Sequence, residues 1–507
     1  MAAEVTVEHV KRTIYFLAPH EPRLDPRVDW TARFLPSTFR GVVYGIRDVS
    51  RPLPAMEEQS GYKIVRLPPA WGGLSEAAQL LAWYIRPPRP ARTRVLLRAV
   101  DAIMDVLGFV LLATLRIFDG IMSLALRLRH RTLDLTRRSA RVMRRRFSPR
   151  SRHDPMPPGH AAGTAGQNAV TRFLQYVRHF IAVTFALVSG VRRASPPSVL
   201  HCHDLNSLLA GVILKRRYGC HLTYDAHEFW PHADVTWTPW EIRIFERYEK
   251  ALLAHVDRAF TVSPMLAEEM RARYGKDFLV VPNCAPMADA RLPIDPAQPL
   301  PEEVAAVISR QGADTGERPL LVLFHGNFAT QRGIEELISA WSKIDPRHAL
   351  LLLRGPANAS RTKCEALASE LGLRGRSVIF LAPVDESELV SASQFADVGV
   401  IPYKPVSLCY RYCSPNKLSQ YMQAGLAILS NHLDFVEHIV RSQECGLTYD
   451  TETPSTIVTA VEALATDRKH LQEFRSNALQ FSITSFNWES YGSQIYDSFE
   501  ALSGGAS

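Results

Sequence analysis

Short hydrophobic runs rich in β-branched residues alternate with amphipathic stretches along most of the chain. The runs predicted as strands cover residues 13–18, 198–201, 221–225, 258–262, 320–326, 349–355, 377–382, 397–403 and 426–430. Repeated alternation of strand and helix is typical of parallel sheets with helices on both faces. We therefore expect an α/β fold of two Rossmann-like, doubly wound domains that face a cleft. Ligands of such sheets bind beyond the carboxyl ends of the strands.

The two series of strands are separated by a Pro-rich stretch with little periodicity, which we interpret as a linker over residues 285–318. The predicted organisation is an N-terminal domain over 1–284 and a C-terminal domain over 319–484. A last helix over 485–507 can return to the N-terminal domain. A chain of 507 residues with 46% hydrophobic residues is too long for one core, which also favours two domains.

An insertion over about residues 86–172 interrupts the N-terminal domain. Its segment 92–152 holds fifteen Arg and four Asp, a local excess of +11 in a chain of net charge +8. The longest uncharged run, 106–115, has ten residues, whereas a transmembrane helix needs about 20. We expect the segment to lie on an anionic membrane surface, with its apolar face in the acyl boundary and its arginines at the headgroups.

Two other interpretations of the insertion stay open. It can be a packed helical subdomain with a solvated basic face, or a nucleic-acid patch. No aromatic-interleaved nucleic-acid module is present, so we predict no nucleic-acid partner. A second apolar stretch, 180–188, is expected to pack against the insertion as a hairpin partner.

The seven cysteines are odd in number, scattered, and include no C-x-x-C pair. This pattern indicates neither a disulfide framework nor a zinc site, and it fits a reducing compartment. The apolar run 13–18 is too short for a signal-peptide core. We therefore expect the protein to be cytoplasmic and peripheral on the inner face of the cell membrane.

Two segments of the C-terminal domain have the pattern of an anion site. In residues 324–341 a strand leads through a turn at Gly326 to a helix, with Arg332 and Gly333 where that helix begins. A helix N-terminus offers unpaired N–H groups and a positive dipole end, and a guanidinium adds a bidentate phosphate ligand. The alternative is a solvated surface arginine.

In the second segment, residues 403–429, Ser414 is predicted as an N-cap and Pro415 as the first helical residue. Asn416 and Lys417 then fall in the first turn, where an anion is favoured. The alternative is a well-capped helix whose Lys417 faces solvent.

Three segments of the N-terminal domain, 17–35, 201–211 and 223–233, follow predicted strands and carry His, Asp and Glu. Side chains at the carboxyl ends of strands can bind an acceptor or move its proton. We place His227 and Glu228 nearest the reacting hydroxyl as catalytic candidates. The acceptor-pocket candidates are His20, Arg27, His203 and Asp204. In the alternative interpretation Asp204 and Asp225 cap helices, and His201 and His203 are satisfied core groups.

The stretch from Phe324 to Val440 resembles the donor domain of family 4 glycosyltransferases and their GT-B relatives. The positions that match the family's motifs are Gly326, Arg332, Gly333, Pro402, Tyr403, Ser414, Pro415, Asn416, Lys417, Tyr421, Met422 and Gly425. The N-terminal segments DPRV, HCHD and YDAHE are similar to that family's other domain.

The resemblance implies a GT-B fold with a nucleotide-diphosphate sugar as co-substrate. Arg332, Lys417, Gly326, Gly333, Ser414 and Asn416 would then bind the diphosphate. The base would rest near Val384, and Gln420 would contact the ribose. The family usually has two glutamates eight positions apart, where this chain has Tyr412 and Gln420; Asn327 also replaces an arginine. Gln420 can still hydrogen-bond a hydroxyl, but without a carboxylate's charge.

The predicted function is transfer of a sugar to a lipid-linked glycan acceptor in surface polysaccharide or glycolipid synthesis, of hexosyltransferase type. The resemblance implies a retaining reaction that needs neither metal nor another cofactor. In a retaining reaction the diphosphate accepts the acceptor's proton, whereas an inverting enzyme would need a base such as Glu228 or His227. The alternatives are a GT-B nucleotide-sugar epimerase and a non-catalytic scaffold in a polysaccharide assembly complex.

Overall fold

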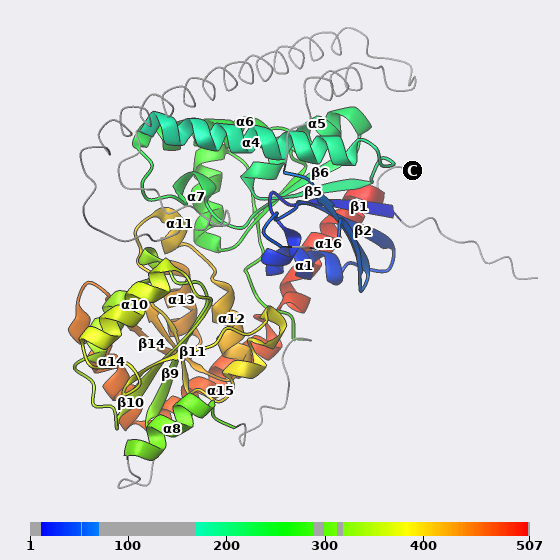
Figure 1. Cartoon of the computed structure of the whole chain (residues 1–507). Coiled ribbons are helices and arrows are strands. Elements are labelled where there is room, and N and C mark those ends of the chain that lie inside the picture. The colour runs from blue at the N-terminus through cyan, green and yellow to red at the C-terminus, as the bar shows by residue number, and fades with distance from the viewer. Residues whose placement is uncertain (1–11, 52, 70–168, 288–298, 312–317, 505–507) are drawn as a thin grey trace, which may run out of the picture.

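A computed structural model describes residues 12–51, 53–69, 169–287, 299–311 and 318–504. They form two α/β domains, the N-terminal one above the C-terminal one in Figure 1. Nearly all of the expected insertion over 86–172, including the membrane segment 92–152, lies outside these ranges.

The N-terminal domain is built on a sheet with strand order β3-β4-β2-β1-β5-β6-β7-β8, parallel except for the pair β3 and β4. Its strands are β1 (Arg12–Leu17), β2 (Phe39–Ile46), β3 (Met56–Gln59), β4 (Tyr62–Leu67), β5 (Val199–His203), β6 (His221–Ala226), β7 (Arg258–Thr261) and β8 (Leu279–Val280). Its helices are α1 (Pro26–Arg33), α4 (Ala169–Val191), α5 (Leu205–Tyr218), α6 (Pro239–Leu253) and α7 (Pro264–Tyr274).

The C-terminal domain has a fully parallel sheet of order β11-β10-β9-β12-β13-β14. Its strands are β9 (Leu320–His325), β10 (Ala349–Arg354), β11 (Val378–Leu381), β12 (Val398–Ile401), β13 (Ala427–Asn431) and β14 (Gly446–Tyr449). Its helices are α8 (Glu302–Gln311), α9 (Ile334–Trp341), α10 (Ala359–Glu370), α11 (Leu408–Arg411), α12 (Asn416–Gln423), α13 (Asp434–Ser442), α14 (Pro454–Thr466) and α15 (Arg468–Thr484).

Helix α4 contains the apolar stretch 180–188, which was expected to pair with the insertion. Phe180, Val183 and Leu187 on this helix belong to the core of the N-terminal domain, against α5, β2 and β4. Among the described residues α4 alone is long and apolar enough to cross a membrane, with 39% of its apolar window buried. One face of α4 therefore packs in the domain core, and the expected pairing with the insertion lies outside the described residues.

The last helix, α16 (Trp488–Gly504), leaves the C-terminal domain and packs on the N-terminal one, as the red helix in Figure 1 shows. Its Phe499 ring lies 6.2 Å from the ring of Phe16 on β1. The Tyr496 hydroxyl donates to the carbonyl of Trp30 on α1 at 3.3 Å. The helix therefore joins the two domains.

Each sheet has one position where the chain reverses its direction of winding. In the C-terminal sheet this position is between β9 and β12, and in the N-terminal sheet it is between β1 and β5. The loops that leave such strands in opposite directions open a crevice at their carboxyl ends. The candidate residues lie at or after the carboxyl ends of β1, β5 and β6 in the N-terminal sheet and of β9, β11 and β12 in the C-terminal sheet.

Candidate functional site

The C-terminal part of the site brings Arg332 and Lys417 onto the same aromatic ring. The guanidinium carbon of Arg332 lies 3.8 Å from the centre of the Tyr403 ring, and Nζ of Lys417 lies 4.4 Å from it. Lys417 also donates a hydrogen bond to the Tyr403 hydroxyl. Among the described residues, neither cation forms an ion pair with a carboxylate. The pair is therefore suited to bind an anion.

The pKa values follow from this arrangement. Burial raises the pKa of the Tyr403 hydroxyl, but Arg332 and Lys417 together lower it below its usual value. Burial lowers the pKa of Lys417, which Tyr403 partly offsets and Arg332 reinforces. Two neighbouring cations without a carboxylate raise each other's energy, and a bound anion would relieve that repulsion.

Glycines let the backbone approach the two cations. Gly326, directly after β9, has φ of 128°, and a Cβ there would lie 3.4 Å from Nζ of Lys417. Gly333 begins α9 with φ of 67°, and a Cβ there would lie 2.0 Å from the carbonyl oxygen of Pro402. Only glycine fits at Gly333, so the Arg332 turn can pack directly on the end of β12.

The start of α12 differs from the sequence prediction. Pro415 is the N-cap and Asn416 the first helical residue, so Ser414 does not cap the helix. The Ser414 hydroxyl instead accepts a hydrogen bond at 3.2 Å from the backbone N–H of Asn283 in the N-terminal domain, and the Asn283 amide donates to the Ser414 carbonyl at 2.9 Å. Ser414 is 2% exposed, so it joins the domains instead of facing the anion position. Asn416, one residue before Lys417, is half-buried.

Gln420 lies one turn beyond Lys417 on α12 and is 3% exposed. Its side-chain amide donates to Oε1 of Glu386 at 2.7 Å. Glu386 and the half-buried Val384 belong to the loop that follows β11, so this loop reaches α12 at the carboxyl edge of the sheet. Glu386 was not among the predicted site residues.

In the N-terminal domain, Arg27 lies too deep to line an acceptor pocket. It is 1% exposed, and its Nε and Nη2 donate to the two oxygens of Asp225 at 2.8 and 2.7 Å. Its Nη1 donates to the carbonyl of Val281 at 2.7 Å and to Oδ1 of Asn283 at 3.1 Å. The prediction that Arg27 contacts the acceptor is therefore wrong, because every guanidinium nitrogen bonds to the protein.

Both ring nitrogens of His227 point into the protein. Nδ1 lies 3.0 Å from Oδ2 of Asp25, and Nε2 lies 2.9 Å from Nδ1 of His203 and 3.3 Å from Oδ2 of Asp225. Burial lowers the pKa of His227, but Asp204, Asp25 and Asp225 raise it well above the usual value.

A raised pKa favours the protonated form of the His227 ring. Both ring nitrogens are engaged inside the protein, so neither is turned toward an acceptor hydroxyl, and this geometry does not favour the expected role of His227 as a base. His203 is fully buried, and burial together with His201 and His227 lowers its pKa well below the usual value. Its neutral ring accepts from His227 and does not reach an acceptor.

Three other candidate groups lie near His227. Asp204 follows β5 with φ of 59°, which is strained for a residue with a side chain, and its Oδ1 accepts from the His227 backbone N–H at 3.2 Å. Burial raises the pKa of Asp204 to about 6. His20 lies with Nε2 3.6 Å from Oδ2 of Asp25. Glu228 accepts from the Cys409 thiol of the C-terminal domain at 3.8 Å, which places it at the junction of the domains.

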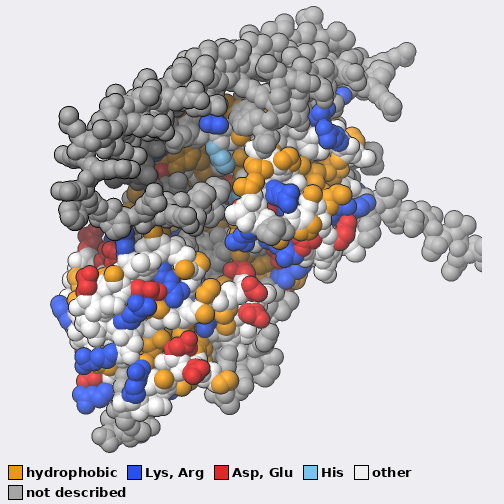
Figure 2. All heavy atoms as spheres, viewed as in Figure 1, with side chains coloured by type: hydrophobic (Ala, Val, Ile, Leu, Met, Phe, Trp, Pro, Cys, Tyr) orange, Lys and Arg blue, Asp and Glu red, His pale blue; other side chains and the backbone are white. Residues whose placement is uncertain are grey.

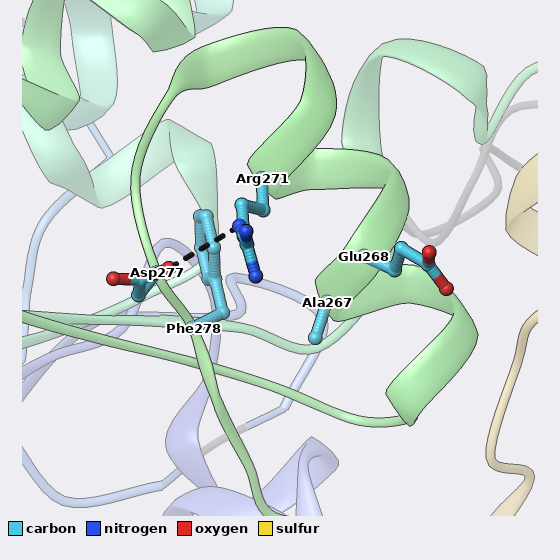
Figure 3. A pocket seen from close by; sticks show the side chains of 5 residues that line it. All are labelled: Ala267, Glu268, Arg271, Asp277 and Phe278. Atoms are coloured by element: carbon cyan, nitrogen blue, oxygen red, sulfur yellow. Dashed lines mark ion pairs between the residues drawn. The ribbon is translucent and has the colours of Figure 1, made fainter.

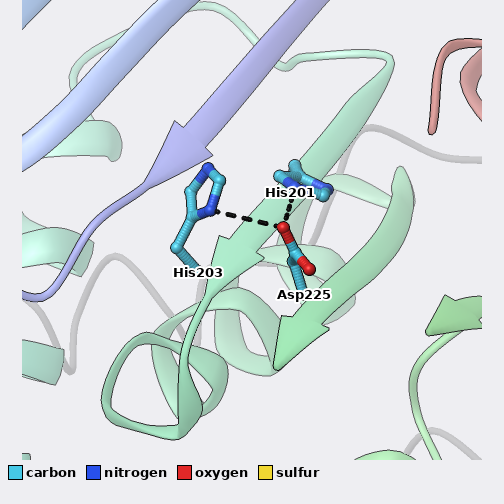
Figure 4. A group of neighbouring side chains, drawn as sticks. All are labelled: His201, His203 and Asp225. Atoms are coloured by element: carbon cyan, nitrogen blue, oxygen red, sulfur yellow. Dashed lines mark ion pairs between the residues drawn. The ribbon is translucent and has the colours of Figure 1, made fainter. Parts of the chain in front are cut away.

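Two groups of side chains have the atom types of a metal site: His201, His203 and Asp225, and His20, Asp25 and Asp204. Figure 4 shows the first group, in which both histidines point at the carboxylate. Both oxygens of Asp225 already accept from Arg27, so a cation here would share the carboxylate with a guanidinium. We interpret the first group as a buried ion-pair network, whereas the side chains of the second group are half-buried.

Two surface hollows lie away from these residues. The one in Figure 3, of about 260 Å³, is lined by α7 and by Asp277 and Phe278, with Arg271 3.6 Å from Asp277. Its lining includes no buried charged group. The hollow lacks the buried charged groups that the candidate residues include. We therefore place the candidate site at the carboxyl edges of the two sheets.

Sequence reasoning missed Asp25, Asp225, Tyr403 and Glu386 as functional residues. Asp25 stands in the DPRV segment and Tyr403 in the Pro-Tyr pair that ends β12, so both were in motifs already identified. Glu386 had no sequence signal, because its partner Gln420 is 34 residues away.

Comparisons with known proteins agree on one family. Residues 40–284 match the model of the glycosyl transferase 4-like domain, and residues 319–467 match that of glycosyl transferases group 1. An uncharacterised glycosyltransferase from Methanocaldococcus jannaschii is 25% identical over 182 residues, which span 36% of this chain and 44% of that relative. The chain thus matches less than half the length of that relative.

Solved structures share the fold at low identity. The sucrose-phosphate synthase of Thermosynechococcus elongatus has a TM-score of 0.60 with 15% identity, covering 97% of this chain and 99% of that one. A glycosyltransferase from Rickettsia africae has a TM-score of 0.54 with 9% identity and the same coverage. The chain therefore belongs to the family 4-like glycosyltransferases and has the GT-B fold.

Proposed function

We propose that the protein transfers a sugar from a nucleotide-diphosphate donor, with Arg332 and Lys417 as the diphosphate ligands. The observation that carries the proposal is the pair of cations, Arg332 before α9 and Lys417 in the first turn of α12, which have no carboxylate partner among the residues that the structure describes. Cations aimed at a departing diphosphate stabilise the charge that develops as the glycosidic bond breaks.

We further propose a retaining reaction without a metal. The bond from the anomeric carbon to the diphosphate breaks, the acceptor oxygen bonds to that carbon on the same face, and the acceptor's proton passes to a diphosphate oxygen. A retaining reaction of this kind needs no protein base. This agrees with His227, whose ring nitrogens point into the protein and whose pKa is raised. The cationic ring would instead orient Asp25 and Asp204 toward hydroxyls of the bound sugars.

The acceptor that we propose is a lipid-linked glycan, handled on the cytoplasmic face of a membrane in surface polysaccharide or glycolipid synthesis. The basic segment 92–152 is one support. Another is an exposed apolar surface where α4 begins: Val170 and Leu174 are 53% and 38% exposed, and Trp240 and Ile244 on α6 are 38% and 41% exposed. The rings of Phe173 and Trp240 lie 5.1 Å apart and join the two helices.

Arginines border this apolar surface. Arg243 and Arg247 lie on the exposed side of α6, next to Ile244. Apolar side chains bordered by arginines suit a membrane with anionic headgroups. By contrast, cations and carboxylates are interspersed over the C-terminal domain on the face seen in Figure 2.

A thermal-shift screen tests the donor proposal. The full chain is heated with UDP, GDP, ADP or CMP, and the screen is repeated with Arg332→Met and Lys417→Met, which keep the apolar stems. Ligands that bind the folded state raise the melting temperature, so one nucleotide should stabilise the wild type and neither variant. Lys343→Met, an exposed lysine near the end of α9, is the matched control. If no nucleotide stabilises the wild type at millimolar concentration, the donor proposal fails and the scaffold interpretation replaces it.

Sedimentation with vesicles tests the membrane proposal. The double variant Trp240→Ser, Ile244→Ser and a deletion of residues 92–152 should each reduce binding to vesicles that contain phosphatidylglycerol. Ile483→Ser, at an apolar position of the C-terminal domain that is 42% exposed, is the control. Unchanged binding and lipid-acceptor turnover in a folded deletion variant would contradict the proposal.

A further inference from the structure

Glu386 is an exposed carboxylate that is hydrogen-bonded to the helix that carries Lys417. It lies in the loop after β11, on the same carboxyl edge of the sheet as Gly326 and Tyr403. A carboxylate near Arg332 and Lys417 would repel a phosphate that bound beside it, since like charges at short distance raise each other's energy. The Glu386 carboxylate can therefore contribute to binding only where it faces a part of the ligand that carries hydroxyl groups.

The bond from Gln420 fixes this carboxylate. Gln420 is buried, and its side-chain amide donates to Oε1 of Glu386 at 2.7 Å. Because Gln420 is buried on α12, its side chain has few rotamers. Its amide therefore holds the Glu386 carboxylate in one orientation. Lys417 and Gln420 are three residues apart, so their Cβ atoms are neighbours on one face of α12, about 5–6 Å apart. Lys417 bears on the anion position and Gln420 holds the carboxylate.

We infer that Glu386 binds the ribose hydroxyls of the donor nucleotide, with Gln420 as its positioning residue. The inference rests on the proposed nucleotide-diphosphate donor. Gln420 carries no charge, and the loop after β11 supplies a carboxylate beside it. A carboxylate accepts hydrogen bonds from hydroxyl groups more strongly than an amide oxygen does. The site therefore selects ribonucleotides over deoxyribonucleotides.

Calorimetric titration of the full chain with UDP, 2′-deoxy-UDP, ADP and 2′-deoxy-ADP tests this inference. For the nucleotide that binds, the wild type should prefer the ribose form by about tenfold, the size expected for a hydrogen bond to a charged group. Glu386→Gln should reduce that preference to about twofold by weakening the ribose form alone. Gln420→Met should also reduce the preference while affinity for the deoxy form is kept.

Glu388→Gln is the matched control, because Glu388 lies exposed in the same short helix, Glu386–Glu388. It should leave both affinities unchanged. A wild type that binds ribose and deoxyribose forms equally, or a Glu386→Gln variant that keeps the full preference, overturns the inference and leaves the donor proposal intact. A wild type that binds none of the four probes overturns both.

Discussion

The guanidinium carbon of Arg332 lies 3.8 Å from the centre of the Tyr403 ring. Lys417 donates to the hydroxyl of that same tyrosine, so one aromatic side chain positions both cations. Tyr403 should therefore matter to nucleotide binding through two separable contacts. Its ring attracts the cations, and its hydroxyl accepts from Lys417.

Tyr403→Phe keeps the ring and removes the hydroxyl, whereas Tyr403→Leu removes both contacts. We expect a loss of nucleotide affinity of about threefold to tenfold for the first variant, the value of one hydrogen bond, and a larger loss for the second. Calorimetric titration measures both. Equal affinities for the wild type and Tyr403→Leu would show that the ring does not position the cations.

Gly333→Ala should be strongly destabilising, because the new Cβ would meet the Pro402 carbonyl oxygen at 2.0 Å. Gly372→Ala is a close control: its φ is 66° against 67° at Gly333, and a Cβ there would meet nothing within 4 Å. Left-handed backbone costs each variant about 1 kcal/mol, and the clash adds about 1–3 kcal/mol at Gly333 alone. Chemical denaturation should separate the two variants; similar losses would contradict the close packing of this turn.

The protonated ring of His227 makes stability depend on pH. Its pKa in the folded state is raised well above the value of 6.5 that applies when it is unfolded. Its contribution is therefore complete below pH 6.5 and is lost as pH rises through the folded-state pKa. It amounts to about 1.4 kcal/mol for each unit of the rise.

His227→Gln should thus lower the melting temperature more at pH 6 than at pH 9. The exposed His348 offers the matched variant His348→Gln, for which we expect the same small change at both pH values. A His227→Gln effect that grew toward pH 9 would mean that the ring is neutral in the folded protein.

The buried pair of Arg27 and Asp225 should be essential for the N-terminal domain. Arg27→Met leaves the Asp225 carboxylate without its main partner, which costs on the order of 3–5 kcal/mol. Adding Asp225→Asn removes the stranded charge and should recover part of the loss. Thermal unfolding measures both variants. If Arg27→Met protein unfolds like the wild type, the carboxylate has another partner that replaces the guanidinium.

Hydrophobic periodicity predicted most of the strands but missed β2, β3, β4, β8 and β14. Strand β3 reads MEEQ and pairs antiparallel at the sheet edge, where one side of the strand has no neighbour. Strand β8 has two residues. Short or polar edge strands form because a neighbour supplies their hydrogen bonds, and their own sequence does not show that neighbour.

The sequence by itself determined the α/β class, the order of the elements, and which side chains follow the strands. These properties depend on local patterns, and parallel strands bring the side chains that follow them to one edge of the sheet. Arg332 and Lys417 were each identified in a separate motif, and the family resemblance joined them as diphosphate ligands.

Only the tertiary structure decided what each side chain bonds to. Arg27 and Asp225 are 198 residues apart, and their pairing makes Arg27 a buried structural residue. Ser414 has the local pattern of a cap, yet it bonds to Asn283, which is 131 residues away in the other domain. Gln420 holds Glu386 across the edge of the sheet. Such partners are chosen by distance and burial in the folded chain, which a periodic pattern of hydrophobic positions does not specify.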